Sequence, residues 1–347
     1  MVSVTGSSQL AQQLLFTRNI SLLTQQLNKQ NEQLGSGRYA GGLIGVSQRA
    51  LELGDLKSQL GTVDNYVKGV QTAQNRVALY ATTIEKIIDI ATDAQDMMIK
   101  NRDPFFAQTA APRVQVETLL DQVGSLMQVK DGARYLFGGT DYTVNPINGQ
   151  LSQLPTAYAA NLVPGAAGYP VPFAAAATAG AYPPAPYAAA TDFLLSNTGT
   201  LANTYNYQGV QLYSDDTEQV SYGVSAAEGG FQELVDALMR FRDATADVTT
   251  NPSNYQVRVD DARTQLLTAI NDLKTVASRN GYVQQQLKEV QDRHAHSQDV
   301  LKTRIGSIEN VDQAAVSVTI KNLQSSLEAS YVITRDTLQL SLVNYLK

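Results

Sequence analysis

The stretch LGDLKSQLGTVDNYVKGVQTAQNRVALYATTIEKIIDIATDAQDMM, residues 53–98, decides the fold. Read at alternating steps of three and four from Leu53, twelve of fourteen positions are apolar, and no proline interrupts them. An apolar stripe held for about six heptads predicts a long helix that packs against a partner helix in a coiled-coil manner. The two polar positions in this stripe are Gln74 and Gln95.

A second stripe, from Val259 to Leu301, supplies the partner. At the same spacing ten of its thirteen positions are apolar, the exceptions being Asn280, His294 and Ser297. The two stripes lie far apart in the sequence, with other residues between them. The simplest arrangement is therefore an antiparallel pair of helices whose far end carries the intervening segment.

Both ends of the chain also read as helices. Residues 1–34 combine spaced leucines with glutamine and asparagine and carry few charges, and a last helix is expected from about Val311 to Asn344. An amide-rich face can be buried against similar neighbours without the cost of desolvating ions. The alternative is a solvated terminal helix, and the apolar tip from Leu338 to Leu346 argues for burial in an assembly.

The segment 141–204 differs from the rest of the chain. It is rich in proline, alanine, glycine and tyrosine, which predicts a small β or partly disordered insert. We therefore expect a mainly α fold with three parts. These are a terminal helical assembly domain (1–42 and 306–347), a helical rod core domain with a β-hairpin (43–140 and 205–305), and a variable outer insert (141–204).

Composition excludes several classes of protein. The chain has 347 residues, a net charge of −6 and no cysteine, so disulfides and thiolate metal sites are excluded and nucleic acid is a poor partner. No run approaches the roughly eighteen apolar residues of a membrane span. The N-terminus lacks the features of a secretory signal, which predicts a cytoplasmic protein or one exported without a cleaved signal.

No catalytic constellation is evident. The chain contains no HExxH, GxSxG or Walker A sequence. His294 and His296 would point about 200° apart on a helix and cannot share a metal, so His294 is expected to be a hydrogen-bonded core residue. Asp89, Asp93 and Asp96 predict a solvated acidic face, or else a contact with a basic neighbouring subunit. We expect no enzyme activity, no cofactor and no metal.

Short segments in both halves of the chain carry a family resemblance. They are QLGSGR (33–38), VQTAQ (70–74), RYLFGG (134–139), YQG (207–209), LEASY (327–331) and SLVNYL (341–346). Together these segments resemble the flagellin superfamily and, within it, the hook–filament junction proteins known as hook-associated protein 3. The segment RYLFGG and the ending SLVNYL favour the junction proteins over filament flagellin.

This resemblance implies a structural protein of the bacterial flagellum. It would join hook to filament through coiled-coil-like packing of its terminal helices, which become helical only on assembly. Its partners would be further copies of itself, the hook-side adaptor, flagellin and an export chaperone, and its location would be extracellular, on the flagellum, after type III export. The alternatives are filament flagellin and a surface-binding flagellin-like protein that acts through its insert.

The residues expected at the assembly interface are apolar positions of the two terminal helices. They are Leu10, Leu14, Leu23, Leu27, Leu34, Val318, Leu327, Tyr331, Leu340, Leu342, Tyr345 and Leu346.

Overall fold

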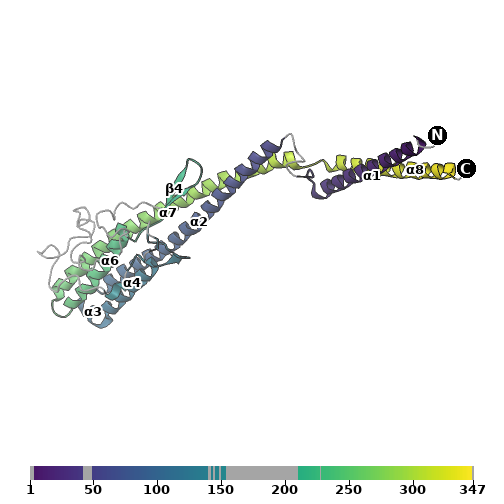
Figure 1. The fold of residues 1–347 in the computed structure, drawn as a ribbon. Helices are drawn as coiled ribbons and strands as arrows, with labels where there is room; N and C mark the ends of the chain where they lie inside the picture. Colours follow the sequence, from purple (N-terminus) through teal and green to yellow (C-terminus); the bar gives the residue numbers. More distant parts are fainter. Residues whose placement is uncertain are drawn as a thin grey trace. The chain divides into compact units, whose positions relative to one another are not determined.

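The computed structural model describes residues 4–41, 49–139, 142–143, 145–147, 150–153, 210–226 and 228–345. Over these residues the chain is mainly helical and carries two small antiparallel hairpins, which confirms the mainly α fold expected from the sequence (Figure 1). The described helices are α1 (Val4–Ser36), α2 (Ala50–Lys100), α3 (Pro104–Ala110), α4 (Pro112–Met127), α6 (Gly229–Ala244), α7 (Pro252–Glu309) and α8 (Gln313–Tyr345). The strands are β1 (Lys130–Asp131), β2 (Arg134–Tyr135), β3 (Val210–Tyr213) and β4 (Gln219–Tyr222), and η1 (Leu151–Gln153) and η4 (Thr245–Asp247) are single 3₁₀ turns.

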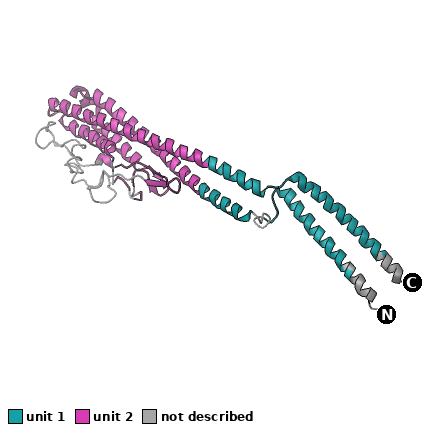
Figure 2. Cartoon of the chain, turned by 90° about the horizontal axis from the view of Figure 1, so that it is seen from above, with its two compact units in different colours: residues 1–64, 295–347 teal, residues 65–294 magenta. Residues whose placement is uncertain are grey.

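The chain divides into two compact units, coloured separately in Figure 2. Unit 1 comprises residues 1–64 and 295–347, and unit 2 comprises residues 65–294. The two long helices α2 and α7 contribute to both units. The three-part division expected from the sequence has other boundaries and stays a prediction.

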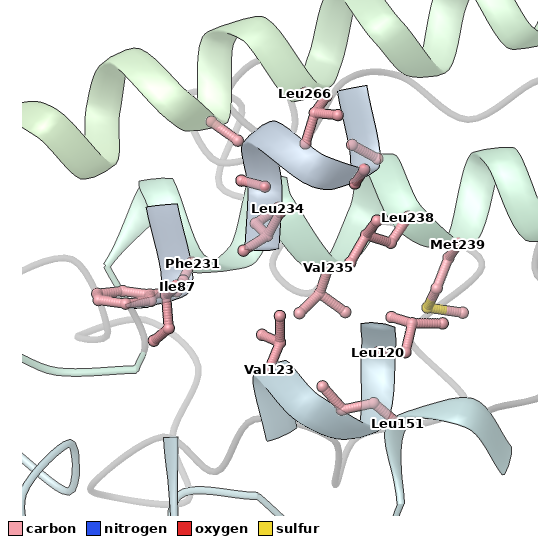
Figure 3. Packing of buried hydrophobic residues seen from close by; sticks show 14 of the residues in the cluster. Ile87, Leu120, Val123, Leu151, Phe231, Leu234, Val235, Leu238, Met239 and Leu266 are labelled. Atoms are coloured by element: carbon pink, nitrogen blue, oxygen red, sulfur yellow. The ribbon is translucent and has the colours of Figure 1, made fainter. Parts of the chain in front are cut away.

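Unit 2 is organised around one apolar core. Its helices α2, α4, α6 and α7 each turn a row of buried side chains toward the others, and Leu151 of η1 closes the gap beside Gly124 (Figure 3). The labelled residues of this core are Ile87 on α2, Leu120 and Val123 on α4, Leu151, Phe231, Leu234, Val235, Leu238 and Met239 on α6, and Leu266 on α7.

Two polar positions of the predicted stripes find hydrogen-bond partners across the α2–α7 pair. The buried side chain of Asn280 donates from Nδ2 to the carbonyl oxygen of Val77 at 3.0 Å. Gln74 donates from Nε2 to Oε1 of Gln291, also at 3.0 Å. These bonds offset the cost of placing polar side chains in an apolar seam.

The second hairpin, β3–β4, packs on the same two helices. Leu212 and Val220 face each other across the ladder and join a small cluster with Val70 and Leu287. Gly69 lets the hairpin approach closely, because a Cβ there would lie 3.3 Å from the Leu212 side chain.

Polar contacts fasten the tip of this hairpin. Tyr66 donates from its hydroxyl to Asp216 at 2.6 Å, and Nε2 of the buried His294 lies 2.6 Å from the carbonyl oxygen of Ser214. The rings of Tyr66 and His294 are stacked, with centroids 5.8 Å apart. The hydrogen-bonded core role predicted for His294 is confirmed.

Three local features could not be located from the two long stripes. β2 ends at Tyr135, and the next two residues, Leu136 and Phe137, are buried in the core. α7 continues through Gly306 to Glu309. The helix α3 was not predicted, although Asp103 caps it by accepting from the backbone N–H of Phe105 at 2.9 Å.

The helix α6 carries charged side chains that are buried within unit 2. Arg240 pairs with Asp236 at 2.7 Å and with Asp261 of α7 at 2.8 Å. Glu233 is also buried, and this burial, together with the charge of Asp272, raises the pKa of its carboxyl group to about 8.

Close approach of α6 to α7 requires a glycine at position 230. A Cβ there would lie 2.9 Å from the backbone nitrogen of Leu273 and 3.1 Å from the carbonyl carbon of Asp272. We expect Gly230→Ala to destabilise the chain by about 1–3 kcal/mol, because the two backbones must separate. Gly281→Ala is the matched control: a Cβ there meets nothing within 4 Å, and the better helix former should add up to about 1 kcal/mol. Urea unfolding would measure the stability of both variants. If Gly230→Ala and Gly281→Ala had equal unfolding midpoints, the close approach of α6 to α7 would be contradicted.

Replacing Glu233 should change how stability depends on pH. The native carboxyl keeps its proton up to a pKa of about 8, whereas the unfolded one has the ordinary value of 4.5. Between these values the native state binds more protons, so stability falls as pH rises through this window. We expect Glu233→Gln to remove this fall and to raise stability at pH 9 by an amount on the order of a few kcal/mol. Thermal unfolding at pH 5 and pH 9 measures it. The control is Glu85→Gln, which changes an exposed carboxyl group. If Glu233→Gln changed the stability equally at pH 5 and pH 9, the raised pKa of Glu233 would be contradicted.

Candidate assembly interface

The terminal helices form a two-helix pair within unit 1. In both views α1 and α8 lie side by side (Figures 1 and 2). The seam consists of side chains at heptad spacing, half-buried on α1 and buried on α8: Leu23, Leu27 and Leu34 on the first helix and Val316, Ile320 and Leu327 on the second. Both helices are formed in the single chain, and their dependence on assembly stays a prediction.

Large apolar side chains also lie on the outer faces of this pair. Leu14 is 67% exposed, Val318 59% and Tyr331 56%. Further exposed members are Leu15 and Leu22 on α1 and Val332 and Ile333 on α8. We call these seven residues the outer apolar set. Two helices are too thin to bury apolar residues on more than one face each, and a gathering of this kind is typical of an interaction surface.

The polar residues between them are mostly uncharged. On α1 the exposed positions include Asn19, Gln25, Gln26, Asn28 and Asn31, all of them amides. Amides can be buried against another polar surface with hydrogen bonds alone, whereas a buried charge needs a partner charge. The outer face of α1 is therefore suited to contact with a similar, weakly charged helix.

The structure separates the predicted interface residues into two kinds. Leu14, Val318 and Tyr331 are exposed and remain available to a partner, while Leu23, Leu27, Leu34 and Leu327 contribute to the seam within the chain. Leu10, Leu340, Leu342 and Tyr345 lie on the helices, but their side chains are outside the described set, as is the whole of Leu346.

Four members of the outer apolar set were not among the residues predicted for the assembly interface. They are Leu15, Leu22, Val332 and Ile333. Each adjoins another apolar residue, as in Leu14-Leu15 and Leu22-Leu23. Successive residues on a helix point about 100° apart, so an apolar doublet places one member outside any single stripe. The doublets were the signal that could have revealed the second face.

Membrane-spanning helices and metal-binding clusters are not found in the described part of the chain. No helix described by the structure is both long and apolar enough to cross a membrane. Among the same residues no three His, Cys, Asp or Glu side chains gather in a way that could hold a metal ion. The three acidic residues Asp89, Asp93 and Asp96 are exposed on α2, as predicted for a solvated face.

Comparison with known proteins agrees with this geometry. Residues 264–346 match the family model of the bacterial flagellin C-terminal helical region, and this range covers much of α7 and all of α8. A search of curated proteins found no significant match. The resemblance found at the C-terminal end of the chain is thereby confirmed: this region is similar to the C-terminal helical region of bacterial flagellin.

Two solved structures are similar to the chain, and one of them supports its fold. A Vibrio parahaemolyticus protein described as a flagellar hook-associated protein is similar with a TM-score of 0.53 at 9% identity, over 75% of this chain and 97% of that one. FlgL from Bacillus cereus gives a TM-score of 0.46 at 12% identity, over 73% of this chain and 99% of that one. At these identities the Vibrio protein supports the fold alone.

A charge placed on the outer apolar set should separate assembly from folding. We expect Ile333→Asp to change the free energy of unfolding of the isolated chain by no more than about 0.5 kcal/mol, because the side chain is half exposed. Thermal unfolding would measure this change. Assembly should fail, because burying an unpaired carboxylate at the contact is costly. Sedimentation or electron microscopy of assembled material would measure the loss.

Two further variants test the specificity of this result. Ser325→Asp adds the same charge at an exposed polar position of α8 and should assemble nearly normally. Leu327→Ala removes a buried seam residue and should destabilise the α1–α8 pair by about 2 kcal/mol or more. If Ile333→Asp assembled as well as Ser325→Asp, the outer apolar set would not be the contact surface.

Proposed function

We propose that this chain is an adaptor of the flagellar axis that joins the hook to the filament through its terminal helices. The observation that carries the proposal is the outer apolar set of the α1–α8 pair, which the chain does not bury by itself. This role is structural, with no catalysis, and its partners are further copies of the chain, the hook-side adaptor and flagellin.

The energy available at this surface is a substantial part of what assembly requires. Burying a fully exposed large aliphatic or aromatic side chain stabilises by about 1.5–3 kcal/mol, and these seven residues are already about half buried, so completing their burial supplies roughly half of that each toward the cost of immobilising a subunit. The exposed faces belong to two different helices, which favours head-to-tail contacts between unlike surfaces. Contacts of that kind generate open helical assemblies when they do not close into a ring.

The choice of a junction protein over filament flagellin rests on sequence patterns. The RYLFGG segment at Arg134–Gly139 and the SLVNYL ending resemble junction proteins. Leu136 and Phe137 of the first segment are buried in the core of unit 2, so this segment acts through folding and not as a contact. Filament flagellin is therefore the alternative that the experiment must separate.

The remaining parts of the proposal concern the export of the chain and the roles of its segments. An export chaperone holds the chain before assembly, and the exported chain becomes part of the extracellular flagellum. Residues 1–42 and 306–347 act in assembly, 43–140 and 205–305 form the core, and 141–204 is the variable outer part.

Immunogold labelling of intact flagella tests the proposal directly. The antigen is best limited to residues 156–204, because Ile147 and Leu151, at the start of the insert, are buried in the core of unit 2. We expect label in a single band where hook meets filament. Label along the whole filament would make the chain a flagellin, and the absence of label from flagella would overturn an axial role.

A deletion variant provides the control for this labelling. A chain that lacks 156–204 but keeps residues 142–153 retains the buried side chains of Ile147 and Leu151. We expect it to assemble and to restore motility while losing all label. Loss of assembly in this variant would show that the insert contributes to the contact and would contradict its assignment as an outer part.

A further inference from the structure

Within unit 1 the chain makes two connections between the α1–α8 pair and the paired ends of α2 and α7. One is the segment that follows α1, and the other joins α7 to α8. Arg38 of the first and Asn310 of the second form an isolated antiparallel bridge. Around it, the N–H of Tyr39 donates to the Glu309 carbonyl at 2.9 Å, and the N–H of Val311 donates to the Gly37 carbonyl at 3.0 Å.

This joint is tight but very short. Gly37 has a φ of +69°, a left-handed conformation that glycine adopts without strain, and a Cβ there would lie 3.4 Å from the Gln313 side chain. Two backbone hydrogen bonds leave rotation about the joint weakly restrained, since an isolated pair of short strands is marginally stable in water. Side chains must therefore supply the rest of the restraint.

Glu309 lies at the centre of the joint. Its side chain is 11% exposed and pairs with Arg38, at 3.6 Å, and with Lys57 of α2. One carboxylate thus connects the segment after α1, the start of α2 and the last turn of α7. An apolar cluster also holds the first turns of α2 against the last turns of α7. Its buried members are Leu53 and Leu56 of α2 and Leu301, Ile305 and Ile308 of α7.

We propose that Glu309 is a positioning residue for assembly, acting through Arg38 and Lys57 to hold the terminal pair in one direction on the α2–α7 base. The proposal rests on the adaptor function, because a fixed direction matters only if the terminal pair is the part that docks. We call the two ion pairs of Glu309, with Arg38 and with Lys57, the clasp. With the clasp intact, the outer apolar set is presented to a neighbour at one angle. With the clasp open, each docking event must first select that angle.

The strength of the clasp suits this role. Arg38 and Lys57 remain largely exposed, and ion pairs of that kind contribute about 0.2–1 kcal/mol each and weaken with salt. Contacts of this size bias the direction of the terminal pair in the free chain. They are also weak enough for a neighbouring subunit to override, which lets one chain fit two unlike neighbours.

The angle can be measured in the isolated chain. The sequence has no cysteine, so Asn31→Cys on α1 and Ser58→Cys on α2, both exposed, can carry two spin labels without further changes. Pulsed electron paramagnetic resonance then gives the distribution of distances across the joint. We expect a narrow distribution that broadens in Glu309→Gln, broadens further in Glu309→Lys, and broadens in the unmodified chain at high salt.

Backbone exchange supplies a second readout. The N–H groups of Tyr39 and Val311 should exchange about three- to tenfold faster in Glu309→Gln, because the ion pairs no longer close the joint. Asp299→Asn is the matched control: it removes an exposed acid from α7 within unit 1 and should change neither readout. Circular dichroism and the thermal midpoint should stay the same in all variants, and the initial rate of assembly should fall only in the Glu309 variants.

The outcomes separate this inference from the adaptor function. A distribution that is already broad in the unmodified chain, or one that Glu309→Gln does not change, would overturn the clasp while leaving the labelling result intact. Broadening as expected, together with gold label away from the junction, would support the clasp and overturn the adaptor role. An equal loss of assembly in Glu309→Gln and Asp299→Asn would also contradict the positioning role.

Discussion

The packing of α2 against α7 is the constraint on which the rest of the structure depends. Within unit 2 their apolar seam provides the surface on which α4, α6 and the β3–β4 hairpin pack. Within unit 1 the first turns of α2 meet the last turns of α7, where Leu53 and Ile305 belong to one cluster. The terminal pair continues from these same helix ends, so any error in their alignment would carry over to the docking surface.

Periodicity made the long elements predictable. A stripe that persists over many turns has one explanation, and α2 and α7 follow it, including the hydrogen-bonded position of the buried His294. Short elements have too few residues to show a period. The seven-residue α3 was hidden for this reason, although the Asp103-Pro104 pair that begins it is a recognised helix start. β2 ends before Phe137, although Phe favours strands, because burial in the core outweighs local β preference.

The candidate interface was predicted in part. The apolar residues of the terminal helices were identified, but the sequence could not tell which of them face each other and which remain exposed. That distinction depends on how α1 and α8 are rotated about their axes, which their mutual packing decides. Likewise, the roles of Glu309 and Lys57 follow from a contact between residues 252 positions apart, and one sequence holds no pattern for such a pair.

The amide of Asn280 has a consequence for how the chain reaches its folded state. Its partner, the carbonyl of Val77, lies 203 residues earlier, so the two helices must meet by closing a very long loop. Heptad seams offer alternative alignments displaced by seven residues, and apolar contacts alone distinguish them poorly. Because the chain must sample such alignments while closing this loop, formation of the α2–α7 pair is expected to be a slow, long-range step of folding.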